Sequence, residues 1–318
     1  MIPTKALARR CADSGHARGQ PTARLDCVRA VVLPGQGAQK PGMLTPWLEL
    51  SGARERLERW SQLCDLDLLE LGTTGTAGQI RDTAAAQPLL TAAGLLSYQA
   101  VKEPFVMVAG HSVGEFAAAV IAGVIHEDHA MAAVSARGRA MAACAAAKPG
   151  TMAAVIGGTA DQVLTAIEDA GAWAANFNGP GQIVAGGDRP AIDRLIQEPP
   201  PQSRVVRLDV AGAFHTPLMA GAEHPLRAAL SDIPVADARV PMVTNHSGLA
   251  MTNGHHIIEA MIKQVSQPVR WDLVLETFAA NGIGAQLELA PSGVLTGLAR
   301  RALKGVALER AHPQDAAA

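Results

Sequence analysis

With 318 residues, the chain is too long for one ordinary core and predicts one large α/β domain with a smaller domain inserted or appended. Its composition is 48% hydrophobic but only 3% aromatic, so we expect an aliphatic interior. The formal net charge of −2 provides no basic surface for phosphates, and apolar stretches such as 117–124 fall short of the roughly 20 residues that span a bilayer. We therefore exclude nucleic acid and membranes as partners.

The four cysteines are scattered without the paired spacing of metal sites or disulfide frameworks. They are Cys11, Cys27, Cys64 and Cys144. We therefore expect no metal, and reduced thiols in a cytoplasmic protein. Residues 1–26 are basic but lack the apolar core of a secretory signal, so we expect a disordered extension there.

Strand and helix patterns alternate in the first half of the chain. A β-branched run predicts a strand at 28–33, and the apolar run 105–109 predicts a second, buried strand. Helices are predicted at 47–60, 84–98, 115–123 and 127–147. The Lys-Pro-Gly sequence at 148–150 ends the last of these and indicates a domain boundary.

Residues 149–212 predict a different order of elements: strand, helix, strand, strand, helix, strand. This order is typical of a ferredoxin-like subdomain. The segments are 152–156, 161–170, 174–178, 182–185, 189–197 and 204–209. We assign 27–148 and 213–318 to a large α/β-hydrolase-like catalytic domain with a parallel sheet. Its second part predicts helices at 216–230, 254–265 and 271–281, a strand at 285–289, and a last helix from Ser292.

Residues 110–114, Gly-His-Ser-Val-Gly, match the G-x-S-x-G nucleophile elbow. In that motif a sharp turn between a strand and a helix exposes the serine hydroxyl, and glycines leave room for the turn. Because the motif lies between a buried-strand pattern and a helix pattern, catalysis by Ser112 is favoured over a structural turn. The helix that follows would direct its amide dipoles at an oxyanion.

A serine hydroxyl needs a base at neutral pH, and ten histidines compete for this role. We select His215, which lies between a predicted strand and a helix that begins at Thr216, a loop position suited to facing a cleft. His111 adjoins the serine but should point away from its hydroxyl, and His255 and His256 lie in a polar loop. On spacing alone, a packed or surface histidine stays an alternative for His215.

Arg137 lies in the middle of the apolar helix 127–147, where an unpaired cation is costly. A salt bridge to a carboxylate at the edge of the core is one interpretation. The other is a bidentate clamp on the carboxylate of a substrate. About one helix-turn-helix separates Arg137 from the elbow, so the guanidinium could lie above Ser112.

Neither glycine-rich loop carries a nucleotide fingerprint. Residues 35–39 lack the third glycine of a dinucleotide site, and 179–182 lack the end of a P-loop. We therefore expect no nucleotide cofactor. The first loop is either an ordinary turn or the source of a backbone amide for an oxyanion hole.

Taken together, five motifs in this order resemble malonyl-CoA:acyl carrier protein transacylases. They are residues 34–39, residues 110–115, Arg137-Gly138, residues 213–216, and Gln264 with residues 268–271. The resemblance extends from about Val28 to Arg310. Details at 82–83 and 86–89 are similar to the actinobacterial branch that serves fatty-acid synthesis.

The resemblance implies that Ser112 is the nucleophile, that His215 is the base, and that the backbone carbonyl of Gln264 orients the imidazole. It further implies an oxyanion hole from the amides of Gln36 and Val113. Arg137 would bind the malonyl carboxylate. The resemblance also implies three residues around the acyl group: Met141 and Asn178 as lining residues, and Phe214 as a side chain that goes with malonyl rather than methylmalonyl.

The implied reaction moves malonyl from malonyl-CoA to the phosphopantetheine of a holo acyl carrier protein, with no cofactor of the enzyme's own. We expect a monomer in the cytoplasm, with a positive patch near the active-site mouth for the acidic carrier. Three alternatives stay open. They are an acyltransferase for a polyketide or malonate decarboxylase carrier, a serine hydrolase, and a catalytically silent module that binds carrier proteins.

Overall fold

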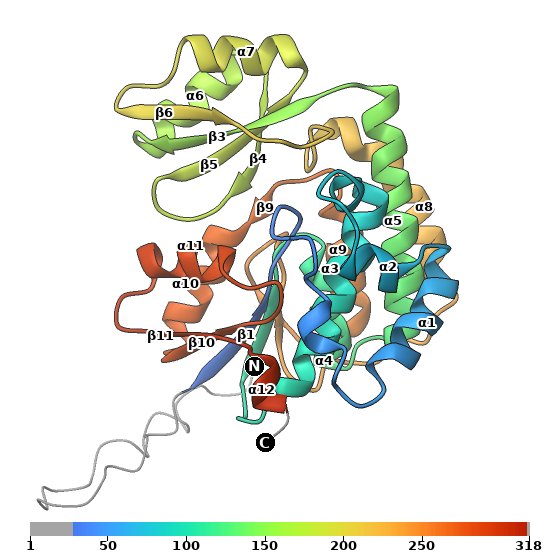
Figure 1. Ribbon diagram of the computed structural model, residues 1–318. Coiled ribbons are helices and arrows are strands. Elements are labelled where there is room, and N and C mark those ends of the chain that lie inside the picture. The colour runs from blue at the N-terminus through green and yellow to red at the C-terminus, as the bar shows by residue number, and fades with distance from the viewer. Residues whose placement is uncertain (1–27, 317–318) are drawn as a thin grey trace, which may run out of the picture.

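The computed structural model describes residues 28–316, in two sheets with helices around them (Figure 1). Within these residues, the larger sheet has six strands in the order β11-β10-β1-β2-β7-β8, and every neighbouring pair is parallel except β7 with β8. Its strands are β1 (Arg29–Leu33), β2 (Met107–Gly110), β7 (Met242–Val243), β8 (Ala250–Met251), β10 (Ala285–Glu288) and β11 (Ala307–Arg310). The parallel sheet predicted from the sequence is confirmed.

The side chains of β1 alternate between the two faces of the larger sheet. Val31 and Leu33 belong to a large hydrophobic cluster, while Ala30 and Val32 belong to a smaller one on the other face. All four are at most 2% exposed. Such central parallel strands are apolar throughout because helices cover both faces.

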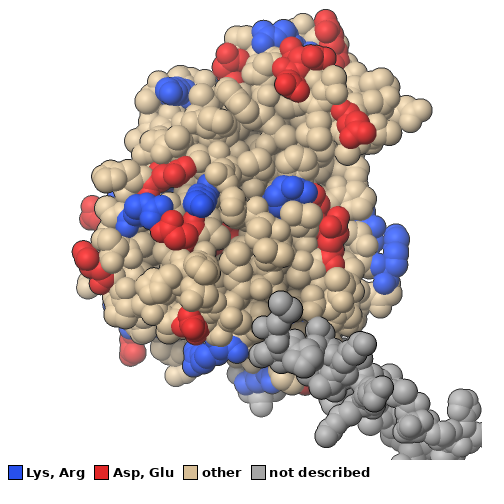
Figure 2. Space-filling view, turned by 180° about the vertical axis from the view of Figure 1, so that it is seen from behind, with Lys and Arg blue, Asp and Glu red and all other residues tan. Residues whose placement is uncertain are grey.

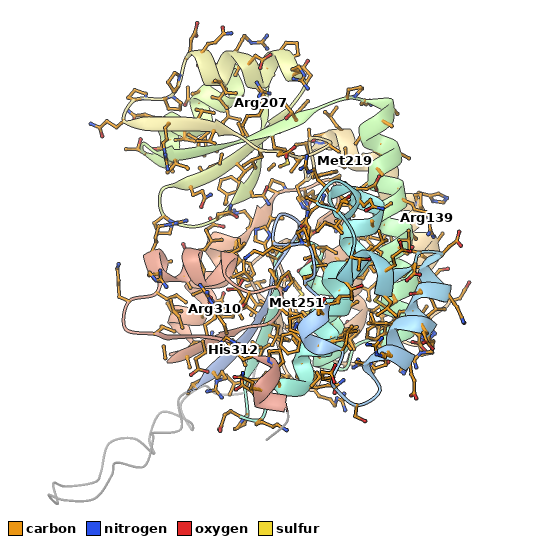
Figure 3. The ribbon with its side chains drawn as sticks, viewed as in Figure 1. Arg139, Arg207, Met219, Met251, Arg310 and His312 are labelled. Atoms are coloured by element: carbon orange, nitrogen blue, oxygen red, sulfur yellow. The ribbon has the colours of Figure 1, made fainter. Side chains whose placement is uncertain are left out.

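Helices on the large-cluster side include the long α5, with α10 and α11 on the other side (Figure 1). The α-helices around this sheet are α1 (Ala53–Cys64), α2 (Leu68–Thr73), α3 (Thr83–Ser97), α4 (Gly114–Ala122), α5 (Glu127–Ala147), α8 (Glu223–Leu230), α9 (Gly254–Lys263), α10 (Trp271–Ala280), α11 (Val294–Ala302) and α12 (Pro313–Ala316). The 3₁₀ helices are η2 (Thr45–Trp47), η3 (Gln79–Arg81), η4 (Tyr98–Ala100) and η5 (Pro217–Ala222). Side chains fill the space between these elements (Figure 3).

The smaller sheet has the order β6-β3-β5-β4-β9 and packs against α6 and α7 through a cluster of its own. Its elements are β3 (Thr151–Gly157), α6 (Ala160–Asp169), β4 (Trp173–Phe177), β5 (Gln182–Gly187), α7 (Arg189–Gln197) and β6 (Ser203–Arg207). The predicted ferredoxin-like order is present. We retain 149–212 as a proposed subdomain, to which β9 (Val269–Arg270) adds a strand parallel to β4 from later in the chain.

One predicted helix is wrong in its position. Instead of a continuous helix at 47–60, η2 ends at Trp47 and α1 begins at Ala53. Gly52 separates the two with a φ of 71°, a left-handed conformation that a continuous helix does not contain. The short elements α2, β7, β8, β9 and β11 were not predicted, since two to six residues carry too little periodicity.

Several sequence-based expectations lie outside the described residues, namely the extension at 1–26 and the states of Cys11 and Cys27. Cys64 and Cys144 are free thiols. Across residues 28–316, no helix is long and apolar enough to cross a membrane. On the face seen in Figure 2, acidic and basic side chains are scattered between wide uncharged areas.

Candidate active site

The turn from β2 to α4 has the geometry of a nucleophile elbow. Ser112 has a φ of 53°, in the left-handed region that few residues other than glycine adopt. A Cβ on Gly110 would lie 2.0 Å from the carbonyl carbon of Gly114, and a Cβ on Gly114 would lie 2.4 Å from the carbonyl oxygen of Leu33. Both glycines of the motif are therefore needed because the backbone approaches itself closely at the turn.

Ser112, His215 and Gln264 form a continuous hydrogen-bonded chain. Ser112 Oγ lies 2.7 Å from His215 Nε2, and His215 Nδ1 lies 2.8 Å from the backbone oxygen of Gln264. A carbonyl only accepts, so Nδ1 carries the proton and Nε2 has a free lone pair toward the serine hydroxyl. The imidazole is thus oriented by a neutral carbonyl in place of the carboxylate of a Ser-His-Asp triad.

Burial, as the largest cause, and the positive charge of Arg137 together lower the pKa of His215 to about 3, against the hydrogen bond to Gln264. The ring is only 4% exposed, and so the charged form is poorly solvated. At neutral pH the imidazole is neutral and able to accept a proton.

Arg137 lies in the middle of α5 and is 1% exposed. Its Nη1 donates to Gln87 Oε1 at 2.7 Å, and its Nη2 donates to Gln264 Oε1 at 2.9 Å and to Ser112 Oγ at 3.4 Å. Burial lowers its pKa, while the nearby Glu115 raises it. The interpretation of a direct salt bridge is wrong, since its partners are two side-chain amides and a hydroxyl.

Close contact of α5 with α3 brings this arginine to the site. A Cβ on Gly138 would lie 3.0 Å from the carbonyl oxygen of Thr83 in α3, so glycine permits the approach. Arg139, two positions further along (Figure 3), donates instead to the carbonyl oxygen of Cys64 at 3.1 Å, because residues two apart on a helix face different ways.

A second layer of buried polar groups supports the elbow from below. Asn245 accepts from the backbone N–H of Ser112 at 2.6 Å and donates to the carbonyl oxygen of Gly110 at 2.7 Å. Glu115 accepts from the backbone N–H of Asn245 at 2.7 Å and from Gln264 Nε2 at 2.6 Å. Burial raises the pKa of Glu115, against those two hydrogen bonds and the charge of Arg137.

A cavity lies over these groups, between the larger and smaller sheets. Its lining includes the predicted site residues Gln36, Ser112, Arg137, Met141, Asn178, Phe214 and His215. Val113 adjoins Ser112 as the N-cap of α4. Asn178 Oδ1 accepts from His111 Nε2 at 3.0 Å, so His111 points away from the hydroxyl. His255 and His256 are exposed and lie in the first turn of α9 rather than in a loop. In residues 28–316, no cluster of His, Cys, Asp or Glu is arranged to hold a metal.

Sequence reasoning missed Gln87 and Asn245 and gave no role to Glu115. Gln87 is 1% exposed within α3, and Asn245 is fully buried after β7. A signal for Gln87 was present, because a polar side chain within the otherwise apolar helix pattern 84–98 needs a buried partner. Nothing in the local sequence marks Asn245.

Comparison with known proteins places this chain in a family. Residues 31–314 match the family model "Acyl transferase domain". The malonyl CoA-acyl carrier protein transacylase of Mycobacterium tuberculosis is 44% identical over 283 residues, which are 87% of this chain and 94% of that protein. The Escherichia coli transacylase of the same name is 34% identical over 284 residues, with 86% and 92% covered.

Solved structures agree with this class. The crystal structure of MCAT from Mycobacterium tuberculosis superimposes with a TM-score of 0.87 at 42% identity, covering 91% of this chain and 98% of that one. A malonyl-transacylase in complex with a type II PKS acyl-carrier protein gives 0.84 at 28% identity, covering 91% and 98%. Fold and elbow thus define an acyltransferase. The chain belongs to the malonyl CoA-acyl carrier protein transacylase family.

Proposed function

We propose that the protein transfers malonyl from malonyl-CoA to the phosphopantetheine thiol of a holo acyl carrier protein, for fatty-acid biosynthesis. The observation that carries the proposal is the 2.7 Å contact of Ser112 Oγ with His215 Nε2, beside the buried guanidinium of Arg137. Family membership supports the choice of malonyl and carrier protein, since relatives bear that name.

In the first half-reaction, His215 Nε2 takes the hydroxyl proton of Ser112 while Oγ attacks the thioester carbonyl. The backbone amides of Gln36 and Val113 are proposed to bind the oxyanion, helped by the N-terminal dipole of α4. His215 then gives the proton to the departing sulfur of coenzyme A. The product of this half-reaction is a malonyl ester on Ser112.

In the second half-reaction the carrier's thiol replaces coenzyme A. His215 takes the thiol proton, the sulfur attacks the ester carbonyl, and the proton passes to Ser112 Oγ as the ester bond breaks. The sum exchanges one thioester for another, so the enzyme consumes no cofactor of its own. The carbonyl of Gln264 holds the imidazole through both halves.

Selectivity for malonyl is assigned to Arg137 and to the apolar wall of the cavity. The guanidinium would bind the free carboxylate of malonyl, an interaction that acetyl cannot make. Met141 and Phe214, which are 1% and 6% exposed, line the same cavity. We assign Asn178 to its polar wall and Phe214 to the exclusion of a methyl branch.

Intact-protein mass spectrometry tests the proposal. Wild type mixed with malonyl-CoA should gain the mass of one malonyl group, and Ser112→Ala should gain none. A wild type that gains no mass would favour a silent binding module. Rapid release of free malonate without any carrier would favour a serine hydrolase.

The carrier is tested separately because a structural relative was solved in complex with a type II PKS acyl-carrier protein. Purified fatty-acid and polyketide carriers, each in the holo form, are offered side by side to the malonylated enzyme. Faster transfer to the polyketide carrier would overturn the fatty-acid assignment. A cytoplasmic monomer is part of the proposal, and light scattering of the eluted protein tests the monomer.

A further inference from the structure

Glu115 is a buried carboxyl group that the mechanism above does not use. It lies in the first turn of α4, three positions after Ser112, and is 1% exposed. One oxygen accepts from the backbone N–H of Asn245 at 2.7 Å, and the other accepts from Gln264 Nε2 at 2.6 Å. Because both oxygens accept from N–H donors, the geometry fits an ionised carboxylate. Burial raises the pKa of Glu115 to about 8, so the group is mainly ionised above that pH.

The side-chain amide of Gln264 separates this carboxylate from the guanidinium of Arg137. Its Oε1 accepts from Arg137 Nη2 at 2.9 Å, while its Nε2 donates to Glu115 at 2.6 Å. The reverse orientation would place NH₂ against the guanidinium and an oxygen against the carboxylate. The two charges therefore fix which way the amide points.

We propose that Gln264 acts as a neutral spacer that lets Glu115 balance the buried charge of Arg137 while leaving the guanidinium free for the carboxylate of the substrate. An isolated buried cation is strongly unfavourable, so a nearby anion stabilises the fold. A carboxylate in direct contact would occupy the N–H groups that the substrate needs. One interposed amide meets both requirements.

This inference rests on the proposed function and assigns two roles beyond it. Glu115 is a positioning residue, and the side chain of Gln264 determines specificity, apart from the contact of its backbone carbonyl with His215. Removing the spacer should therefore impair malonyl transfer more than acetyl transfer, since acetyl has no carboxylate to bind.

The double variant Glu115→Gln with Gln264→Glu tests the spacer. This variant keeps the net charge and shape of the pair but places the anion directly against Arg137. It also removes the 3.2 Å contacts that Gln264 Nε2 makes with Ser112 O and Asn245 Oδ1. The measured quantity is the ratio of kcat/KM for malonyl transfer to kcat/KM for acetyl transfer, at about pH 8.5, where Glu115 is mainly ionised. This ratio should fall about 100-fold, mainly through the KM for malonyl-CoA. An unchanged ratio would overturn the proposal, even if both activities fell.

Glu259→Gln is the matched control, because it makes the same chemical change at an exposed ion pair with Arg227 of α8. Glu259 lies in α9, the helix that ends just before Gln264. The ratio for this control variant should equal that of wild type. If wild type itself forms no malonyl-Ser112, the proposed function has failed. If wild type reacts and the double variant keeps its ratio, only the spacer has failed.

Glu115→Gln alone, in a Ser112→Ala background, covers the case in which the double variant does not fold. Without the anion of Glu115, the bound carboxylate of malonyl-CoA alone balances the buried charge of Arg137. Saturating malonyl-CoA should therefore raise the Tm of this variant more than that of Ser112→Ala, by several degrees. Equal shifts would contradict the spacer.

Discussion

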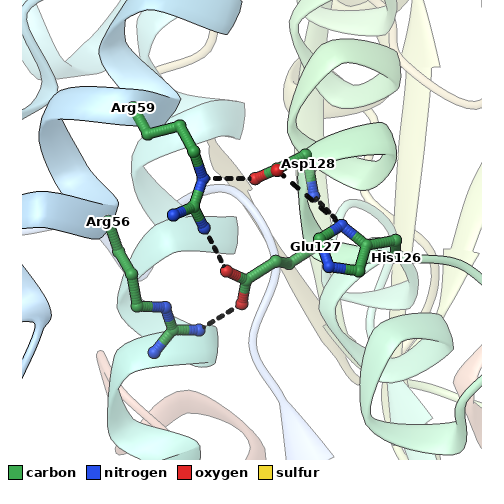
Figure 4. Close-up of polar contacts among 5 residues, drawn as sticks. All are labelled: Arg56, Arg59, His126, Glu127 and Asp128. Carbon is green, nitrogen blue, oxygen red and sulfur yellow. Dashed lines mark hydrogen bonds and ion pairs between the residues drawn. The ribbon is translucent and has the colours of Figure 1, made fainter.

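Helix α5 carries charged groups in two environments: one pairs them with opposite charges, and the other surrounds the charge with neutral groups. At its first turn, Glu127 and Asp128 form direct ion pairs with Arg56 and Arg59 of α1, at distances of 2.5 to 2.8 Å (Figure 4). In its middle, Arg137 is almost fully buried and donates only to uncharged oxygens. The charges near the surface pair with one another, whereas the buried charge has no carboxylate in direct contact.

The largest effect on activity is expected from removing the buried charge of α5. Arg137→Ala should lower kcat/KM for malonyl-CoA by about 100- to 1,000-fold, because the substrate carboxylate loses its buried partner. Acetyl transfer should fall much less. Steady-state assays with both thioesters measure this, and Arg139→Ala on the same helix is the control. Equal losses for the two substrates would exclude a carboxylate clamp.

A smaller effect is expected from the amide that holds the other end of the guanidinium. Gln87→Leu removes the 2.7 Å hydrogen bond to Arg137 Nη1 and leaves a side chain of similar size. Loss of one hydrogen bond to a charged group should lower kcat/KM for malonyl-CoA about tenfold. Kinetics that match wild type would mean that Gln264 alone aligns the guanidinium.

The protonation of His215 should change little between neutral and mildly acidic pH. The pKa of His215 is lowered to about 3, so the imidazole remains neutral well below the ordinary value of 6.5. Between about pH 7 and 5, the rate of Ser112 malonylation should change less than about twofold, where an ordinary histidine would slow it more than tenfold. Rapid-quench mass spectrometry measures the rate. A loss centred near the ordinary pKa would contradict a buried neutral base.

The same lowered pKa has a defined effect on stability. The unfolded chain protonates His215 near pH 6.5 and the folded chain does not, so the contribution of this group to the free energy of unfolding is lost as the pH falls from 6.5 toward 3. Urea denaturation at several pH values follows this loss, with the His215→Gln variant as the reference.

The smallest effect is expected at the exposed cluster. Arg59, whose side chain is 44% exposed, contacts both acidic residues of α5. Arg59→Ala should lower the free energy of unfolding by about 0.5 kcal/mol, and by less at high salt, with malonyl transfer unchanged. Urea titrations at two salt concentrations provide the measurement. A salt-independent loss would point to packing rather than charge.

Local patterns in the sequence predicted most of the main elements because their signals lie within a few residues. The bounds of α5 were predicted at 127–147, and the Lys-Pro-Gly sequence at 148–150 marks its end. The failure at 47–60 came from Gly52, whose left-handed conformation interrupts the apolar pattern. Strand β9 was missed because two residues become a strand only by pairing with β4.

The candidate site, too, could be predicted from the sequence only in part. The serine motif and the loop position of His215 were visible in the sequence, and the structure brings the two side chains together. The partners of Arg137 were not visible, because Gln87 and Gln264 meet it from 50 and 127 positions away. The sequence left a salt bridge and a clamp open, and the interposed amide that distinguishes them exists only after folding.

The connection after Gln264 links the catalytic histidine's partner to the smaller sheet. Gln264 caps α9, and a few residues later Val269 pairs with Asn176 of β4. The segment whose carbonyl aligns the imidazole therefore connects α9, beside the larger sheet, to a strand of the smaller sheet. A shift of β4 relative to the larger sheet would therefore also shift the backbone carbonyl that accepts from His215 Nδ1.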